Sequence, residues 1–99
     1  MCGIIGINSN KPVSATIINS LKKLEYRGYD SAGIATLYDG SIKEIKSEGR
    51  VDNLEKSSLI KNMEGTIGIG HVRWATHGSP NSINAHPHSS QNVSVVHNG

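Results

Sequence analysis

The spacing of apolar residues changes several times along the chain, and each change marks a predicted element. Residues 3–8 form a short apolar run rich in β-branched side chains, which predicts a buried strand. The next apolar residues recur at helical spacing: Val13, Ile17, Leu21 and Leu24. We expect this helix to start with Asn10 or Lys11 as its capping residue and Pro12 in its first turn, and to end at Gly28.

A hairpin is the next predicted element. Residues 31–38 and 41–47 both have the composition of strands, and Asp39-Gly40 lies between them. An Asp-Gly pair between two such runs is a strong signal for a tight β-turn. Three apolar residues among Lys, Glu and Ser then indicate a second, short amphipathic helix: Val51, Leu54 and Leu59.

The last third of the chain has the pattern of two strands separated by a long loop. Residues 66–73 and 93–97 predict the strands, whereas residues 74–92 show no periodicity and contain many Ser, Asn, His and Pro. A loop of that length inside a compact domain is usually functional. The order strand, helix, hairpin, helix, strand, strand favours an α+β fold with a largely antiparallel sheet. It does not favour a Rossmann fold, because no Gly-rich turn opens a helix after the first strand.

The composition narrows the possible functions. The net charge of the 99 residues is only +2, since 10 Lys and Arg are diluted by 8 Asp and Glu, so nucleic acid binding is not expected. A single cysteine excludes an internal disulfide and fits a reducing compartment. No apolar run approaches the roughly 20 residues of a membrane span, and the N-terminus lacks the features of a signal peptide. We therefore expect a cytoplasmic protein without a membrane partner.

Cys2 is the only cysteine, and it follows the initiator methionine. If Met1 is removed, one residue carries both a thiol and the free α-amino group of the chain. An α-amino group with a pKa of roughly 7.7–8.0 could serve as the base that activates the thiol. The alternative is that Cys2 is a small buried residue at the start of the first strand, and taken alone Cys2 favours this alternative.

Arg73 begins a segment that lies where a predicted strand enters the long loop, which is a favourable place for a binding site. Arg73 could hold a carboxylate through two parallel, charge-assisted hydrogen bonds. Trp74 and Thr76 would shape the wall of such a pocket. The alternatives are a surface ion pair for Arg73 and a half-buried core position for Trp74.

All five histidines fall between positions 71 and 97. His86 and His88 are two residues apart and could share one face of an extended segment, as metal ligands do. Zinc sites usually need three or four ligands, however, and no supporting carboxylate or thiolate stands nearby in the sequence. We therefore predict no metal site, and expect these histidines to hydrogen-bond the loop to itself and to the site.

Two further segments carry candidate chemistry. The side-chain amide of Asn98 and the backbone N–H of Gly99 could form an oxyanion hole for a tetrahedral acyl intermediate. An ordinary Asn-Gly turn is the alternative there. Arg27 could pair with Asp30 and hold residues 26–33 beside the N-terminus, which would support the site without touching a substrate.

Five segments together resemble the glutaminase domain of the class II, or N-terminal nucleophile, glutamine amidotransferases. They stand in the family's order and spacing across the whole chain: MCGIIG at 1–6, LEYRGYDSAGIA at 24–35, GHVRWATHG at 70–78, NAHPH at 84–88 and VVHNG at 95–99. The sequences RGYDSAG, RWATHG and NAHPH are similar to the branch of the family that aminates a sugar phosphate. The related amidophosphoribosyltransferases differ at these three segments.

The resemblance implies an N-terminal nucleophile hydrolase fold, with stacked, mainly antiparallel sheets between helices in an α/β/β/α arrangement. It implies that Cys2 attacks the side-chain amide of L-glutamine while its own amino group transfers the proton, and that Asn98 and Gly99 form the oxyanion hole. Arg73 would bind the α-carboxylate as one of four residues that contact glutamine: Arg73, Trp74, Thr76 and His77. Three residues would support the site from behind: Arg27, His86 and His97. No cofactor is implied.

The resemblance also implies that residues 2–99 are the N-terminal portion of this domain. In the family the ammonia passes to a sugar isomerase domain, which aminates fructose 6-phosphate, and we expect the complete protein to be a homo-oligomer. Part of the glutamine site would lie beyond Gly99, so we expect the isolated 99-residue chain to be inactive. The alternatives are the glutaminase domain of an amidophosphoribosyltransferase and a catalytically inactive, truncated or regulatory fragment.

Overall fold

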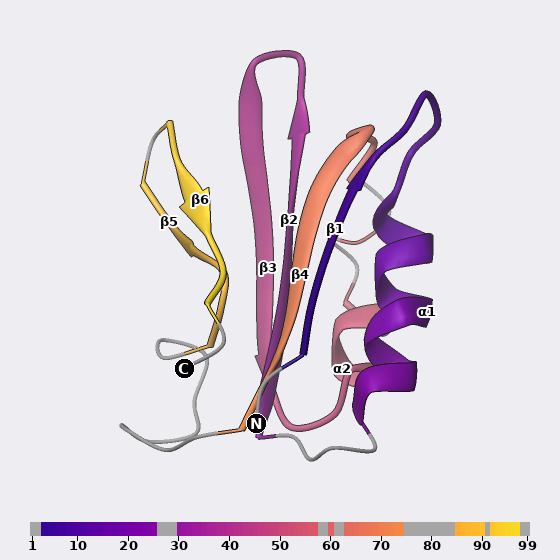
Figure 1. The fold of residues 1–99 in the computed structure, drawn as a ribbon, viewed down its shortest axis with the longest axis vertical. Coiled ribbons are helices and arrows are strands. Elements are labelled where there is room, and N and C mark those ends of the chain that lie inside the picture. The colour runs from indigo at the N-terminus through magenta and orange to yellow at the C-terminus, as the bar shows by residue number, and fades with distance from the viewer. Residues whose placement is uncertain are drawn as a thin grey trace.

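A four-stranded antiparallel sheet with the strand order β1-β4-β2-β3 forms the centre of the computed structural model (Figure 1). Its strands are, in chain order, Gly3–Asn8 (β1), Ser31–Tyr38 (β2), Ser41–Glu48 (β3) and Ile67–Arg73 (β4). The structure describes residues 3–25, 30–57, 60, 63–74, 85–90 and 92–97. The predicted α+β class is confirmed, as are the first strand, the hairpin and the strand over 66–73.

The β2–β3 hairpin turns at the predicted Asp-Gly pair. Both residues have a positive φ, 51° for Asp39 and 76° for Gly40, as a tight turn between twisted strands requires. On its other edge β2 pairs with β4, and β4 pairs in turn with β1. Strand β4, which comes late in the chain, therefore lies between β1 and β2, which come early.

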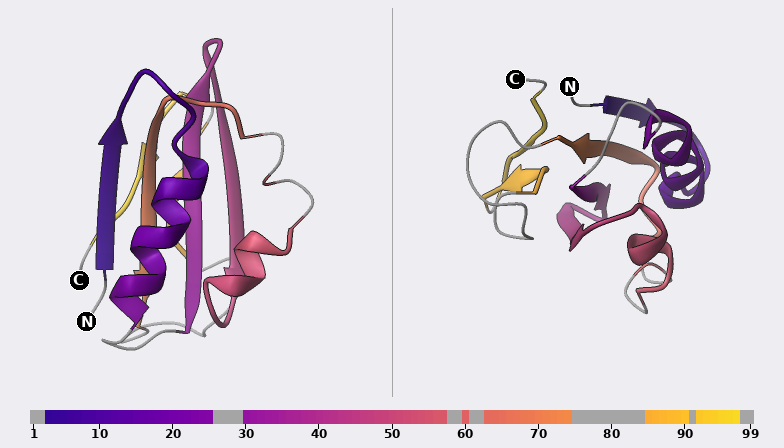
Figure 2. Two further views of the ribbon diagram at one scale, coloured as in Figure 1. Left: turned by 90° about the vertical axis from the view of Figure 1, so that its right-hand side faces the viewer. Right: turned by 90° about the horizontal axis from the view of Figure 1, so that it is seen from below.

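Two helices, α1 over Ser14–Leu24 and α2 over Asp52–Glu55, lie on one face of the sheet (Figure 2). Helix α1 buries Ile17, Ile18 and Leu21 against the strands. The core between helices and sheet consists of one cluster of buried side chains: Val13, Ile17, Ile18, Leu21, Ala32, Ile34, Ile45, Val51, Leu54, Met63 and Val72. No helix in the described segments is long and apolar enough to cross a membrane.

The predicted start of the first helix is wrong. The residue that precedes α1 is Val13, and neither Asn10 nor Lys11 caps it. The backbone N–H of Ser9 donates to the carbonyl of Thr66, and that of Val13 donates to the carbonyl of Gly65. These two bonds hold the connection alongside the start of β4, so the helix begins only after it.

The ends of both helices also differ from the sequence pattern. Helix α1 ends at Leu24 with Glu25 as its cap, before Gly28, which lies outside the described residues. Helix α2 has four residues and buries Leu54. Val51 caps it rather than opening it, and Leu59 also lies outside the described residues.

The predicted long loop contains a strand that sequence analysis missed. Residues His88–Ser89 (β5) pair with Ser94–Val95 (β6) in a second, two-stranded antiparallel sheet. The predicted strand over 93–97 is therefore reduced to two residues. Polar side chains dominate both partners, so neither has the apolar alternation by which a strand is recognised in a sequence.

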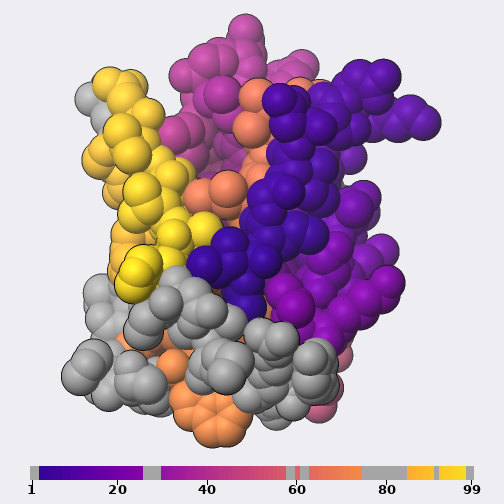
Figure 3. All heavy atoms as spheres, in the orientation of Figure 1, coloured from indigo at the N-terminus to yellow at the C-terminus, as the bar shows by residue number. Residues whose placement is uncertain are grey.

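The face of the main sheet opposite the helices is only partly covered. Ile4, Leu37 and Ile67 are each more than 40% exposed on this face. The C-terminal segment with β5 and β6 lies over part of it, and Figure 3 shows atoms of β4 between that segment and β1.

Candidate functional site

Arg73 lies at one end of the sheet, the lower end in Figure 1, where β1, β2 and β4 meet. Strand β4 ends at Arg73, which pairs with Ser31 at the start of β2. Strand β1 begins at Gly3, which pairs with Val72. Cys2 is bonded to Gly3, so the predicted nucleophile is next in the chain to this end of the sheet. Cys2 itself lies outside the described residues.

Arg73 is buried beside a carboxylate. Its side chain is 10% exposed, and Nη1 lies 3.9 Å from Oδ1 of Asp30. Hydrogen bonds hold Asp30 in place. Its backbone N–H donates to the Arg73 carbonyl at 2.8 Å, and its own carbonyl accepts from the backbone N–H of Gly49 at 2.8 Å. Its Oδ1 accepts a hydrogen bond from the Ser31 hydroxyl at 2.9 Å. A buried guanidinium needs such a partner, because an uncompensated charge is costly to bury. A surface ion pair is therefore the wrong description of Arg73.

Asp30 pairs with Arg73, and the pairing of Arg27 with Asp30 that sequence analysis proposed stays a prediction. Arg27 lies outside the described residues. Trp74, the residue after β4, is 49% exposed, so it does not occupy the half-buried core position considered from the sequence. Thr76 and His77 also lie outside the described residues, and their roles in binding stay predictions.

Histidine rings from two segments stack on the same face of the sheet as Arg73. His71 is fully buried and lies two residues before Arg73 in β4, so their side chains share one face. The ring of His86 stacks on that of His71, with centroids 4.2 Å apart and planes 21° apart. His88 packs on His86 at 4.4 Å in a tilted arrangement.

Gly33 makes this stacking possible. It pairs with His71 across the β2–β4 ladder and so lies on the same face. A Cβ atom on Gly33 would lie 2.0 Å from the carbonyl oxygen of His86, far inside van der Waals contact. Because Gly33 has no side chain, the backbone at residue 86 can pack directly against the sheet.

A hydrogen bond links His71 to the C-terminal segment. Its Nε2 lies 2.8 Å from the carbonyl oxygen of His97. A carbonyl oxygen only accepts, so Nε2 carries the proton and Nδ1 presents a lone pair. Within the described residues, this buried Nδ1 and the Nδ1 of His86 have no hydrogen-bond partner.

Both stacked imidazoles are neutral near pH 7. Burial lowers the pKa of His71; the hydrogen bond to the His97 carbonyl offsets part of this effect, and the positive charge of Arg73 adds to it. Burial, and then the nearby His71, lower the pKa of His86 to about 4. Sequence analysis expected His86 and His88 to hydrogen-bond the loop, and that stays a prediction, whereas the structure shows the ring of His86 stacked on His71.

Sequence analysis did not select His71 as a site residue. The signal was present in the alternation of the strand over 67–73, which places His71 on the same face as Arg73. The described residues contain no group of three or more His, Cys, Asp or Glu side chains that could hold a metal ion. The absence of a metal site stays a prediction, since Cys2 and His77 are not among the residues described.

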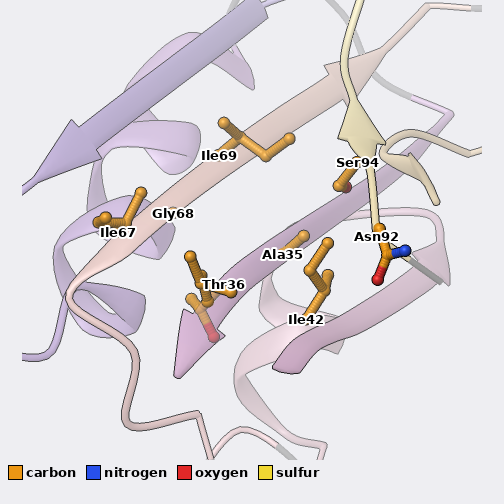
Figure 4. Close-up of a pocket in the computed structure, with 9 residues that line it drawn as sticks. Ala35, Thr36, Ile42, Ile67, Gly68, Ile69, Asn92 and Ser94 are labelled. Carbon is orange, nitrogen blue, oxygen red and sulfur yellow. The ribbon is translucent and has the colours of Figure 1, made fainter. Parts of the chain in front are cut away.

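An apolar cleft of about 200 Å³ lies at the other end of β4 (Figure 4). Strands β2, β3 and β4 and the C-terminal segment form its walls: Ala35, Thr36, Leu37, Ile42, Ile67, Gly68, Ile69, Asn92 and Ser94. Ile67 and Arg73 are six residues apart in an extended strand, which separates them by roughly 20 Å. Among the candidate site residues that the structure describes, none lines this cleft, and Arg73 lies at the opposite end of β4.

Sequence comparison finds close relatives along the whole chain. The chain is 54% identical over 99 residues to glutamine–fructose-6-phosphate aminotransferase (isomerizing) of Mesorhizobium japonicum, and 56% identical to the protein of the same name from Brucella abortus. Both matches cover 100% of this chain and 16% of the relative. The chain thus spans about one sixth of the length of the curated relatives it matches. No family model matches the chain.

Solved structures with a similar fold include a glutamine amidotransferase. Glutamine phosphoribosylpyrophosphate amidotransferase from B. subtilis, complexed with ADP and GMP, has a TM-score of 0.75 and 26% identity, over 93% of this chain and 20% of that chain. A structure described as the allosteric regulatory enzyme of purine biosynthesis has a TM-score of 0.77 and 25% identity, over 88% of this chain and 18% of that one. These similarities support the predicted N-terminal nucleophile type of α+β fold.

Proposed function

We propose, from the premise that the chain belongs to the glutamine–fructose-6-phosphate aminotransferase family, that residues 2–99 are the N-terminal portion of its glutaminase domain. The observation that carries the proposal is the 54% identity over all 99 residues to an enzyme of that name. The buried Arg73 at the end of β4, beside the start of β1, supports it. The complete enzyme, meaning a polypeptide that continues this chain as its relatives continue, would be glucosamine-6-phosphate synthase.

Cys2 would be the nucleophile once Met1 is removed. Its α-amino group takes the thiol proton, and the sulfur forms a bond to the amide carbon of the glutamine side chain. The proton passes to the leaving nitrogen, the C–N bond breaks, and ammonia departs from a γ-glutamyl thioester. Water then hydrolyses the thioester to glutamate and restores the thiol. Asn98 and Gly99 would donate hydrogen bonds to the oxyanion of each tetrahedral intermediate.

Arg73 would bind the glutamine α-carboxylate with its planar guanidinium. Asp30 lies 3.9 Å from Nη1 and is itself held by Ser31, so the orientation of the guanidinium is set before substrate arrives. The exposed Trp74 would form part of the pocket wall with Thr76 and His77. Three residues would support these contacts from behind: Arg27, His86 and His97.

The ammonia would be transferred in the complete enzyme to fructose 6-phosphate, bound in a separate isomerase domain, to give glucosamine 6-phosphate. This places the enzyme in amino-sugar biosynthesis and in the cytoplasm, as a homo-oligomer that needs no cofactor in this domain. An amidophosphoribosyltransferase is the second candidate. It is less well supported, because the structural neighbour of that kind is only 26% identical.

Replacement of the nucleophile tests the proposal directly. In the complete enzyme, Cys2→Ala should abolish the release of ammonia from glutamine and leave the isomerisation of fructose 6-phosphate intact. A diazo-ketone analogue of glutamine should alkylate the wild type at Cys2, as peptide mass spectrometry would show. The matched control is Gly6→Ala in β1, where an added Cβ has no atom nearer than 3.9 Å and activity should persist.

Three outcomes would contradict the proposal. Hydrolysis of glutamine by Cys2→Ala would remove Cys2 as the nucleophile. A wild type that never hydrolyses glutamine would favour the inactive, regulatory alternative. An active enzyme whose intact mass retains Met1 would exclude the α-amino group of Cys2 as the base.

A further inference from the structure

The hydrogen bond from His71 reaches the residue that precedes both predicted oxyanion donors. Nε2–H of this fully buried ring donates to the carbonyl oxygen of His97 at 2.8 Å. The carbonyl carbon of His97 is bonded to the backbone nitrogen of Asn98, and the peptide unit that they share is planar. A hydrogen bond that holds the carbonyl oxygen therefore also restrains the orientation of this peptide plane.

We propose that His71 is a positioning residue for the oxyanion hole, because it anchors the peptide that leads into Asn98 and Gly99 to the central strand of the sheet. This inference rests on the proposed glutaminase function. An oxyanion hole accelerates a reaction because its donors are in place before the charge develops. Such donors need a rigid support behind them, and a loss of that support is felt in the rate.

The anchor itself is rigid. His71 lies in β4 between Ile4 of β1 and Gly33 of β2, so its backbone has a strand on each side. The ring of His86 stacks on it at 4.2 Å, in the space that Gly33 leaves open. The ring is therefore held by the sheet, by the stack and by its hydrogen bond.

The anchored segment needs this support. Strand β6 ends at Val95, and the side chain of His97 is exposed. Within the described residues, the bond from His71 is the hydrogen bond that reaches the backbone beyond Val95. Without the Nε2 donor, the carbonyl of His97 would lose this hydrogen bond. The peptide plane that contains this carbonyl could then rotate.

His71 is assigned a positioning role because its protonated nitrogen is already engaged. Nε2–H points to the His97 carbonyl, and the other nitrogen is buried. Burial also lowers the pKa of the ring, so it stays a neutral donor near pH 7. His71 therefore acts through the backbone of His97, and no direct contact with glutamine is assigned to it.

Two substitutions in the complete enzyme separate the hydrogen bond from the ring. His71→Phe keeps a flat ring for the stack with His86 and removes the donor. His71→Gln keeps an N–H donor at a similar reach and loses the ring. We would measure kcat and KM for glutamine and the inhibition constants of two ligands. Glutamate γ-semialdehyde forms a tetrahedral adduct when the sulfur of Cys2 bonds to its aldehyde carbon, whereas glutamate forms no oxyanion.

For His71→Phe we expect kcat to fall by about 10- to 100-fold with little change in KM, since an interaction made in the transition state is lost. Inhibition by the semialdehyde should weaken by a similar factor, and inhibition by glutamate should not change. His71→Gln should recover most of both losses. A purely structural role of His71 would instead weaken both ligands together.

Several results would overturn the inference. One is a wild-type kcat in His71→Phe. Another is that inhibition by the semialdehyde and inhibition by glutamate weaken equally in His71→Phe. A third is that kcat falls as far in His71→Gln as in His71→Phe. If His71→Phe does not fold, His71→Gln decides alone: wild-type kcat and semialdehyde inhibition support the donor role, and a loss of either contradicts it. Failure of the proposed function itself would appear earlier, as a wild type without Cys2-dependent hydrolysis of glutamine.

Discussion

Successive residues of the seven in strand β4 face opposite sides of the sheet, and the two sides carry different kinds of residue. On the helix side, Cβ atoms on Gly68 and Gly70 would lie 2.7 and 2.5 Å from atoms of Ile17, and Val72 belongs to the buried core. On the other side, apolar residues give way to His71 and Arg73 toward the end of the strand. The first face is specialised for close packing, and the second places polar groups where three strands meet.

A glycine therefore has a different structural role on each face of the sheet. Gly70 is small so that α1 can approach the sheet and bury Ile17. Gly33 is small so that the loop carrying His86 can approach from the other side. A substitution on the helix side should therefore act on stability, and one on the other side should act on the site.

The largest effect is expected for Gly33→Ala. A methyl group there would meet the carbonyl oxygen of His86 at 2.0 Å, and a backbone atom cannot give way as a flexible side chain does. The loop should move off the sheet and His86 off His71, and displacement of supporting groups by about 1 Å can cost on the order of 10²-fold in rate. Glutaminase kinetics of the complete enzyme would measure this. Gly6→Ala on the same face is the control, and equal rates in the two variants would contradict the prediction.

Gly70→Ala should act on stability with less effect on the reaction. The new methyl group would lie 2.5 Å from Cγ2 of Ile17, a buried β-branched side chain that cannot turn away. Overpacking of this kind costs about 1–3 kcal/mol. Thermal inactivation of the complete enzyme, compared with Gly6→Ala, would report the loss. If Gly70→Ala is as stable as the control but catalytically impaired, the division between the two faces is wrong.

Arg73→Lys should raise the KM for glutamine by about tenfold and change kcat little. Lysine keeps the charge but not the planar fork that can bind both oxygens of a carboxylate. Steady-state kinetics would show the effect. Arg50→Lys, at an exposed position, is the matched control and should resemble the wild type. An unchanged KM in Arg73→Lys would remove Arg73 from the glutamine site.

The stacked histidines should make the site sensitive to acid. The folded pKa of His86 is about 4, below the usual value of 6.5, so the unfolded chain binds a proton more readily. Stability should therefore fall as the pH drops from about 6.5 toward about 4, and His71 should add to the effect in the same direction. His86→Phe keeps the stack without the titration, so its melting temperature should fall less over this range. Parallel pH profiles in the two proteins would contradict this.

The smallest effect is expected at Lys22, which links the two helices on the packed face. Its Nζ lies 2.8 Å from Glu55 and 3.4 Å from Asp52, on the protein surface. Exposed pairs of this kind contribute little and are screened by salt. Lys22→Ala should lower the melting temperature slightly at low salt and not at high salt. Lys23→Ala is the control, and a large effect that persists in salt would show a role beyond this ion pair.

Elements whose pattern is local could be predicted from the amino-acid residues alone. Alternation and β-branched residues defined β1, β2, β3 and β4, and Asp39-Gly40 defined the hairpin turn. The five segments of the family resemblance also selected Arg73 and the histidine-rich loop as candidates for a site. These signals lie within a few neighbouring residues, so they can be read without knowledge of the fold.

Other features depend on contacts between residues that are far apart in the chain, and only the folded structure shows them. The start of α1 is delayed because Ser9 and Val13 bond to the two residues that precede β4, more than fifty positions later in the chain. Strand β5 pairs with β6, although neither has an apolar pattern. His71, His86 and the carbonyl of His97 also come together over Gly33. Contacts of this kind come from the approach of separate backbones, which no local spacing of residues records.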